Sequence, residues 1–189
     1  MSWATTEGAE AKTLEDVHCI RDWPGPGRDA DYSWKTPSRL AYARDDDAMQ
    51  TNQWGYSVLP KMKSYTWFKL RLDPEQATKY DDPELVHSEG TGVLALPPGK
   101  TAVDVCADFL CEVASFAVGE LQRRLSSEVL QATPLEFWIT VPAVWSDRAT
   151  ADTLRVAQQA AAQARVTCNA GAEVFLIREP EGDWVGIHV

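Results

Sequence analysis

Apolar and polar residues change their spacing about halfway along the chain. In the first part, short apolar runs stop at turn residues: Val17–Trp23 before "PGPGR", Ser38–Ala43 before an acidic turn, and Gln53–Leu59 before a proline. Runs of this length and boundary predict β-strands. The next run, Ser64–Asp73, fits a strand and a helical turn equally well. The polar stretch Gln76–Gly92 is expected to form an exposed excursion, where insertions are tolerated.

The second part shows a helical period. Apolar residues recur at steps of three and four between Thr101 and about Ser126, and Thr101 is the expected N-cap. A second helix is expected from Asp147 to about Ala164, with Ser146 or Asp147 as its cap. The stripe of the first helix comprises Val103, Cys106, Leu110, Val113, Ala117 and Leu121.

Two apolar runs flank the second expected helix. "LEFWITVPAV" precedes it and is nearly all apolar, as is typical of a parallel strand covered on both faces. "EVFLIREP" follows it. Strand, helix and strand over some forty residues predict a right-handed βαβ unit, so the chain is assigned to the α/β class.

Composition narrows the classes of function. The 189 residues are 44% hydrophobic, which suffices for a core. A net charge of −10 with scattered Lys and Arg argues against a nucleic-acid partner. No run of eighteen apolar residues predicts a membrane span, and "MSWATTEGAEAKTLEDVH" does not resemble a signal peptide. We therefore expect a cytoplasmic chain whose cysteines (Cys19, Cys106, Cys111, Cys168) are reduced and bind no metal.

Two common catalytic patterns are not met. "PPGKT" resembles the end of a phosphate-binding loop, but Leu94 stands where that loop needs its first glycine, and two prolines remove backbone amides. A proline-stiffened turn before a helix is the favoured interpretation. Nucleophilic catalysis has no support either, because His18, His87 and His188 are scattered and the chain contains no Gly-x-Ser-x-Gly elbow.

The remaining candidates for functional residues lie at the ends of the two apolar runs. In α/β sheets, ligands bind beyond the carboxyl ends of the strands. Pro142 ends the first strand because proline donates no ladder hydrogen bond, and Pro180 stops the second just after Glu179. A carboxylate there could order a metal-bound water near phosphate. From spacing alone, an exposed acid before a turn is the favoured interpretation.

At these residues the sequence resembles a known family. "ITVPAVWSDRATADTLRVAQQAA" followed by "LIREPE" is similar to the core of the seventy-kilodalton heat-shock chaperones, most of all to their divergent fungal-type relatives in the actin-like ATPase superfamily. "TPSRLAYA", "WGYSV", "WFKLRLD" and "LPPGKTAVDVCADFL" resemble further segments of that family, in the family's order. The matches run from about Asp16 to Glu181.

The resemblance implies a partial actin-like, ribonuclease H-like lobe. Residues 16–98 would form a β-rich upper part with its excursion near 74–92, residues 99–181 an α/β core, and residues 182–189 a divergent tail. The family binds and hydrolyses ATP with magnesium, in a cycle coupled to protein folding. Its Glu-Pro glutamate, which lies by the magnesium and the attacking water, corresponds to Glu179. Its proline that couples nucleotide state to the partner domain corresponds to Pro142.

The sequence also departs from the family. The phosphate-cradling Asp-Phe-Gly-Thr-Thr hairpin, the second phosphate loop and the adenosine-binding Gly-Gly segment do not occur in it. The family's lysine near the attacking water falls on Leu59, with Lys61 and Lys63 as neighbours, and its relay arginine falls on Thr150. We therefore expect a truncated lobe that binds neither ATP nor magnesium alone.

Three hypotheses follow for function. The first is such an ATPase lobe without turnover of its own. The second is a non-catalytic module that keeps the lobe in order to pair with a protein partner, through an exposed apolar face of the lobe, or with a missing half. The third is an unrelated α/β enzyme, for which the sequence offers no site.

Overall fold

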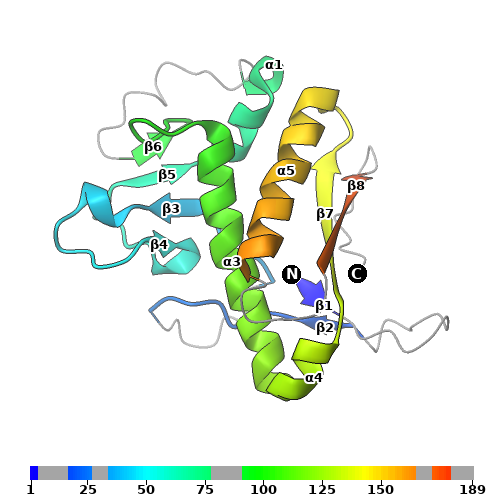
Figure 1. Ribbon diagram of the computed structural model, residues 1–189. Helices are drawn as coiled ribbons and strands as arrows, with labels where there is room; N and C mark the ends of the chain where they lie inside the picture. Colours follow the sequence, from blue (N-terminus) through cyan, green and yellow to red (C-terminus); the bar gives the residue numbers. More distant parts are fainter. Residues whose placement is uncertain (4–16, 27–33, 78–90, 165–171, 180–189) are drawn as a thin grey trace.

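The computed structural model describes residues 1–3, 17–26, 34–77, 91–164 and 172–179. Four layers follow one another in Figure 1: a small sheet (β3–β6), the long helix α3 (Ala102–Arg124), the helix α5 (Asp147–Ala164), and the strand pair β7–β8. The α/β class is confirmed. Most of the expected excursion, the tail 182–189, His87, His188, Cys168 and Pro180 lie outside the described residues.

The small sheet has the order β4-β3-β5-β6. β3 (Arg39–Ala41) pairs antiparallel with both β4 (Gln53–Trp54) and β5 (Ser64–Thr66), and β5 pairs parallel with β6 (Thr91–Val93). A separate antiparallel pair joins β1 (Ser2–Trp3) to β2 (His18–Cys19). Strands were thus expected at β2 to β5, although these are shorter than the apolar runs that predicted them, whereas β6 begins within the stretch that was expected to be an exposed excursion.

Local turns explain two of these differences. After Trp54 the chain enters a 3-10 turn, Gly55–Ser57, in which Gly55 has a φ of 58°, so the expected strand Gln53–Leu59 ends early. The run Ser64–Asp73, which fitted a strand and a helical turn equally well, contains both. The strand β5 comes first, and a 3-10 helix, η4 (Phe68–Leu72), follows. Shorter helical pieces are η2 (Ala43–Asp45) and α1 (Pro74–Ala77).

The two long helices begin where their caps predicted. The Thr101 hydroxyl accepts from the Asp104 amide at 3.2 Å, and the Asp104 carboxylate accepts from the Thr101 amide at 2.7 Å, which forms a capping box. The Ser146 hydroxyl accepts from the Ala149 amide at 3.2 Å in the first turn of α5. One helix was missed: α4 (Ser127–Ala132), capped by Ser126, occupies the polar stretch that was expected only to return the chain.

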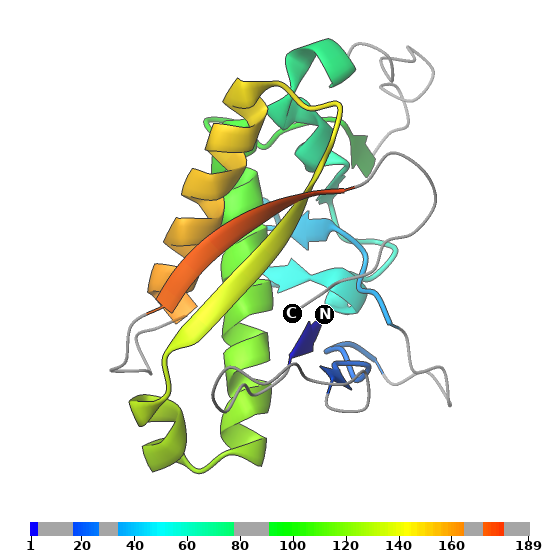
Figure 2. The same cartoon turned by 90° about the vertical axis from the view of Figure 1, so that its right-hand side faces the viewer.

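The predicted βαβ unit is present as β7 (Leu135–Pro142), α5 and β8 (Ala172–Glu179), with the two strands parallel in one register from Leu135↔Ala172 to Pro142↔Glu179. The expectation that β7 is covered on both faces is wrong. Val141 on the helix side is 1% exposed, whereas Trp138 on the other side is 37% exposed. Among the described residues, α5 and α3 cover one face only, and the other face is the one turned toward the viewer in Figure 2.

Two clusters of buried residues hold the layers together. The larger joins Leu40 and Tyr65 of the small sheet through α3 to Val141, Trp145 and Val156 of the βαβ unit. The smaller packs the end of α3 against Leu130 of α4 and the last turns of α5. No helix in the described ranges combines the length and the apolar character that crossing a membrane requires.

Candidate functional site at the ends of β7 and β8

The carboxyl ends of β7 and β8 bring the two sequence candidates together. Pro142 and Glu179 are partners in the last rung of the parallel pair. Side chains that are partners in a parallel register lie on the same face. The register alternates, so Thr140 and Ile177 also lie on this face, which is the open one.

Glu179 makes one direct contact on that face. The Thr140 hydroxyl donates to Glu179 Oε1 at 3.0 Å. Glu179 is half-buried, not fully exposed as the sequence predicted, because the neighbouring strand supplies this hydroxyl and covers part of its side chain. Sequence reasoning missed Thr140, although its position two residues before Pro142 on the same strand is the signal that would have found it.

The turn after β7 is held by Asp73, a residue that is distant in sequence. The Ser146 amide donates to Asp73 Oδ2 at 2.9 Å, and the Glu75 amide donates to Asp73 Oδ1 at 3.2 Å. Asp73 is 2% exposed and Trp145 is 5% exposed. The Lys69 ammonium lies 5.2 Å from the centre of the Trp145 ring. A buried carboxylate between η4 and α1 therefore fixes the start of α5, and nothing in the sequence pattern marks that role.

The charged residues near this edge do not converge on Glu179. Arg178 precedes Glu179 in the strand, so its side chain lies on the opposite face, where it comes within 3.6 Å of Asp147. Both of those side chains are largely exposed. No hydrogen bond or ion pair in the described part of the chain joins a lysine or arginine to Glu179.

No hydrogen bond or ion pair among the described residues joins Glu179 to the positions that correspond to the family's other catalytic groups. Leu59 and Lys61 are exposed near the small sheet, and the Lys63 ammonium lies 5.8 Å from the ring of Tyr65. Thr150 is in the first turns of α5, and its hydroxyl is buried without a hydrogen-bond partner among the described residues.

ATP with magnesium is therefore not matched by the described residues of this edge. Bound phosphate needs converging amides or cations, and magnesium needs several oxygen ligands. Here one carboxylate, already bonded to Thr140, faces outward, and the adjacent guanidinium of Arg178 points the other way. The described ranges contain no group of three or more His, Cys, Asp or Glu placed to hold a metal ion.

The cysteines of α3 offer no reactive thiolate. Burial raises the pKa of the Cys106 thiol to about 12, and burial, followed by the nearby Asp108, raises the pKa of the Cys111 thiol. Both are free and buried, as expected for thiols in the core. Because the thiolate is the nucleophile, these two residues are structural.

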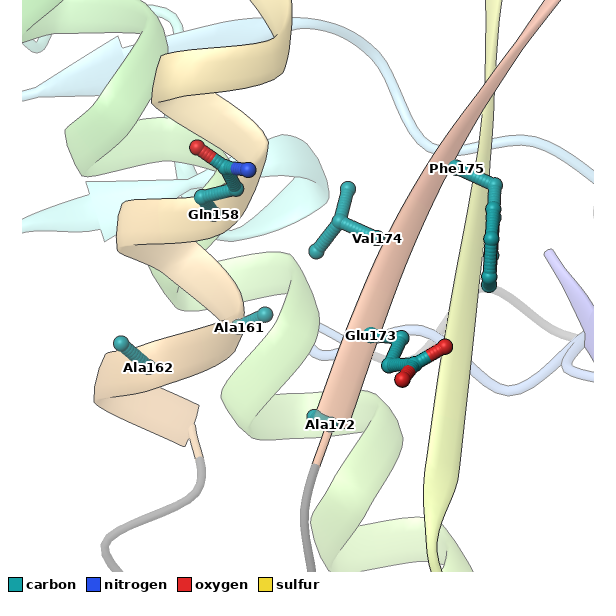
Figure 3. Close-up of a pocket in the computed structure, with 7 residues that line it drawn as sticks. All are labelled: Gln158, Ala161, Ala162, Ala172, Glu173, Val174 and Phe175. Carbon is teal, nitrogen blue, oxygen red and sulfur yellow. The ribbon is translucent and has the colours of Figure 1, made fainter.

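A groove of about 390 Å³ lies between the later turns of α5 and the first half of β8. In Figure 3, Val174 points toward Gln158 of α5, while Phe175 points away from α5 and lies over β7. The alanines Ala161 and Ala162 of α5 and the start of β8 complete the lining. The groove lies at the amino end of β8, so it is separate from the rung that holds Glu179.

Phe175 contributes to an aromatic surface on the open face. Its ring stacks on Trp138 of β7, with centroids 4.5 Å apart and planes 22° apart. The Trp138 indole N–H donates to Glu136 on the same face at 3.0 Å. Trp138 and Ile177 are each 37% exposed. The open face is thus apolar in its middle, with Glu136 near one end and Glu179 at the other.

Comparison of the chain with protein-family models, with curated proteins and with solved structures finds no match.

Proposed function

We propose that the chain is a lobe of an actin-like ATPase of the seventy-kilodalton heat-shock type, and that it does not hydrolyse ATP on its own. One observation carries the proposal: β7 and β8 run parallel around α5 and end on one rung with Pro142 and Glu179. That rung places a proline and a carboxylate side by side at the carboxyl edge, where ligands of α/β sheets bind. The in-order resemblance of the upstream segments supports the same assignment.

The groups around Glu179 support the proposed lack of turnover. Phosphoryl transfer depends on donors and metal positioned around the phosphates. Glu179 is bonded to Thr140, and Arg178 is turned toward Asp147. The described part of this edge therefore offers one carboxylate, whereas phosphoryl transfer needs several positioned groups. A second lobe would have to supply the other donors and the metal ligands.

Calorimetry with magnesium and ATP tests the absence of turnover. We expect no binding in the micromolar range and no phosphate release. The complementary lobe of a chaperone of this type, expressed separately, should associate with the chain in sedimentation experiments. Micromolar ATP binding by the chain alone would contradict the first expectation, and a complementary lobe that sediments independently would contradict the assignment as a lobe.

A second candidate, a non-catalytic protein-interaction module, is favoured by the open face of β7–β8. Its stacked Trp138–Phe175 pair and the exposed Ile177 place large apolar side chains beside one another, whereas such residues are usually scattered on a monomer's surface. We expect the Trp138→Ser variant to bind a hydrophobic dye about twofold less and to self-associate less than the parent chain. Leu59→Ser is the matched control, because Leu59 is 44% exposed but lies away from this face. Equal effects of the two variants would contradict a role for the face.

A further inference from the structure

The open face of β7–β8 carries carboxylates at both ends and apolar side chains in its middle. We propose that this face binds an amphipathic helix of a partner protein, whose apolar stripe is flanked by lysine or arginine at both ends. The positions that alternate onto the face, from 136 to 142 and from 173 to 179, include glutamates but no lysine, arginine or histidine. The inference rests on the second candidate function, the protein-interaction module, and it names the partner which that module takes.

One end of the face sets two acids opposite each other. Glu136 and Glu173 are partners in one rung, and both are exposed. Glu136 accepts from the Trp138 indole, a neutral donor, and no hydrogen bond or ion pair in the described ranges reaches Glu173. Figure 3 shows Glu173 turned away from α5, on the side of Phe175. Like charges directly opposite each other destabilise a strand pair, so a cation from outside the chain would relieve this rung.

The middle of the face offers a firm apolar contact. The rung next to the two acids is the stacked pair of Trp138 and Phe175, and the rung after it holds Ile177. Trp138 and Ile177 keep part of their side chains accessible to solvent. Because the stacked rings already hold each other in place, a partner that packs on them orders little further side-chain freedom.

The other end of the face repeats the negative charge. Glu179 accepts from the Thr140 hydroxyl, which is again a neutral donor. Glu173 and Glu179 lie in the same strand, and the six steps between them span about 20 Å at about 3.3 Å per residue. A helix of about 13 residues has the same length, so basic side chains at its two ends would meet both sets of carboxylates.

The parallel pairing of the strands favours a helix as the occupant. Parallel sheets are ordinarily covered by helices on both faces, and in the described part of the chain α3 and α5 cover one face of β7–β8. A second copy of this face would bring glutamates against glutamates, which disfavours binding. A helix with an apolar stripe and basic ends is complementary to both the middle and the ends of the face.

The experiment is a fluorescence anisotropy titration of the full chain with three labelled peptides of about 14 residues. All three share one helical stripe of leucines and differ only at its flanks, which are lysine and arginine, glutamine, or glutamate. The cationic peptide should bind in the micromolar range, the glutamine peptide about tenfold more weakly, and the glutamate peptide about a hundredfold more weakly. Raising the salt concentration to about 0.5 M should bring the three affinities together, because ions screen the charged contacts.

Variants of the chain locate the binding. Glu136→Gln combined with Glu173→Gln should weaken the cationic peptide by about tenfold and change the glutamine peptide by less than about twofold. Asp46→Asn combined with Asp47→Asn removes the same charge from a turn near the small sheet, which α3 and α5 separate from β7–β8 (Figure 1). This control should change the cationic peptide by less than about twofold. Trp138→Ser should weaken both peptides.

A melt of the unbound chain separates a binding role from a structural one. Glu173→Gln removes the repulsion within its rung, so the melting temperature should stay the same or rise while the cationic peptide binds more weakly. A glutamate that serves the fold would act in the opposite direction, and a lower melting temperature of this variant would therefore overturn the proposal.

The titrations can overturn the proposal in three further ways. The cationic peptide could fail to bind at about 100 μM, or the glutamine or glutamate peptide could bind as tightly as the cationic one at low salt. The variant that lacks both Glu136 and Glu173 could keep the parent affinity. Sedimentation could also show a dimer, dependent on Trp138, that the cationic peptide does not dissociate, because a second copy would then be the occupant.

Failure of the partner assignment differs from failure of the interaction module. If Trp138→Ser lowers dye binding more than Leu59→Ser but the peptides show no preference for basic flanks, the module stands and its partner has other chemistry. If the two variants lower dye binding equally, the open face has no role in binding and the module itself is contradicted.

Discussion

The small sheet and the β7–β8 pair differ in how far their residues are shielded from solvent. In β5 even the polar residues are enclosed: Ser64 is 2% exposed and Thr66 is 9% exposed. In β7 the largest apolar residue, Trp138, is 37% exposed. β5 has three residues and β7 has eight. The comparison shows that neither the length of a strand nor its apolar content tells how firmly it is enclosed, because enclosure depends on which elements pack on each face.

The largest effect should come from the enclosed sheet. Leu40 in β3 is fully buried in the larger cluster, between the sheet and α3. Leu40→Ala should lower the free energy of unfolding by about 2–5 kcal/mol, through lost transfer energy and the cavity that remains. A denaturant melt measures this loss. A loss below that of Val141→Ala would show that the small sheet is not the better enclosed region.

The covered face of the second region should come next. Val141 in β7 is 1% exposed and packs in the same cluster. Val141→Ala should cost about 1–3 kcal/mol, less than Leu40→Ala because fewer carbon atoms are removed from the core. The same denaturant melt, run on Trp138→Ala of the open face, is the control. If that control costs as much as Val141→Ala, then the open face is covered in solution.

The contact between the two regions is tested at Asp73. Removing its carboxylate leaves the Ser146 amide without its acceptor beside a buried side chain. Asp73→Ala should cost about 1–3 kcal/mol, the usual penalty for a buried donor that loses its partner. Thermal unfolding followed by tryptophan fluorescence measures it. Asp46→Ala, in an exposed turn, serves as the matched control and should change stability little.

The cap of α3, the helix on which both regions pack, should have a smaller effect that depends on pH. The Thr101 side chain, and then its backbone amide, hold the pKa of Asp104 below its ordinary value of 3.8. The folded pKa lies below the unfolded one, so this stabilisation is fully present above about pH 4 and is lost as pH falls through the folded pKa. Thr101→Ala should cost about 1 kcal/mol at neutral pH. Its melting temperature should differ less from that of the parent chain near pH 2, and a constant difference would contradict the capping box.

Glu179→Gln should have the smallest effect. The glutamine carbonyl can still accept from the Thr140 hydroxyl, and the residue is only half-buried. The change should stay within about 0.5 kcal/mol, as is usual for substitutions near the surface. Pro142→Ala should likewise cost no more than about 1 kcal/mol. If Glu179→Gln is the most damaging of these variants, the carboxylate is a structural partner.

The sequence predicted best where the signals are local. The starts of α3 and α5 follow from Thr101 and Ser146, whose hydroxyls accept from amides three residues on. The pairing of β7 with β8 follows from two apolar runs around a helix. Strand lengths in the first part were overestimated, because the left-handed turn at Gly55 is a backbone property that an apolar run hides.

The site was predicted in part. Pro142 and Glu179 were expected at the strand ends, and the register places them in one rung. The hydroxyl of Thr140 was overlooked, although its position two residues before Pro142 places it on the same face. The carboxylate of Asp73 was not expected, because its contact with Ser146 spans a long separation in sequence. The left-handed backbone of Trp67 is likewise not revealed by the sequence "YTWFK".

The bond from Ser146 to Asp73 has a consequence for hydrogen exchange. The amide of Ser146 lies in a turn, where exchange with solvent is ordinarily fast, but it donates to a buried carboxylate 73 residues away. Exchange at this amide requires that the turn separate from Asp73, since a bonded amide is protected until it opens. The exchange rate at this amide therefore reports how often the small-sheet region and the βαβ unit separate. The motion between them can be followed at one backbone position.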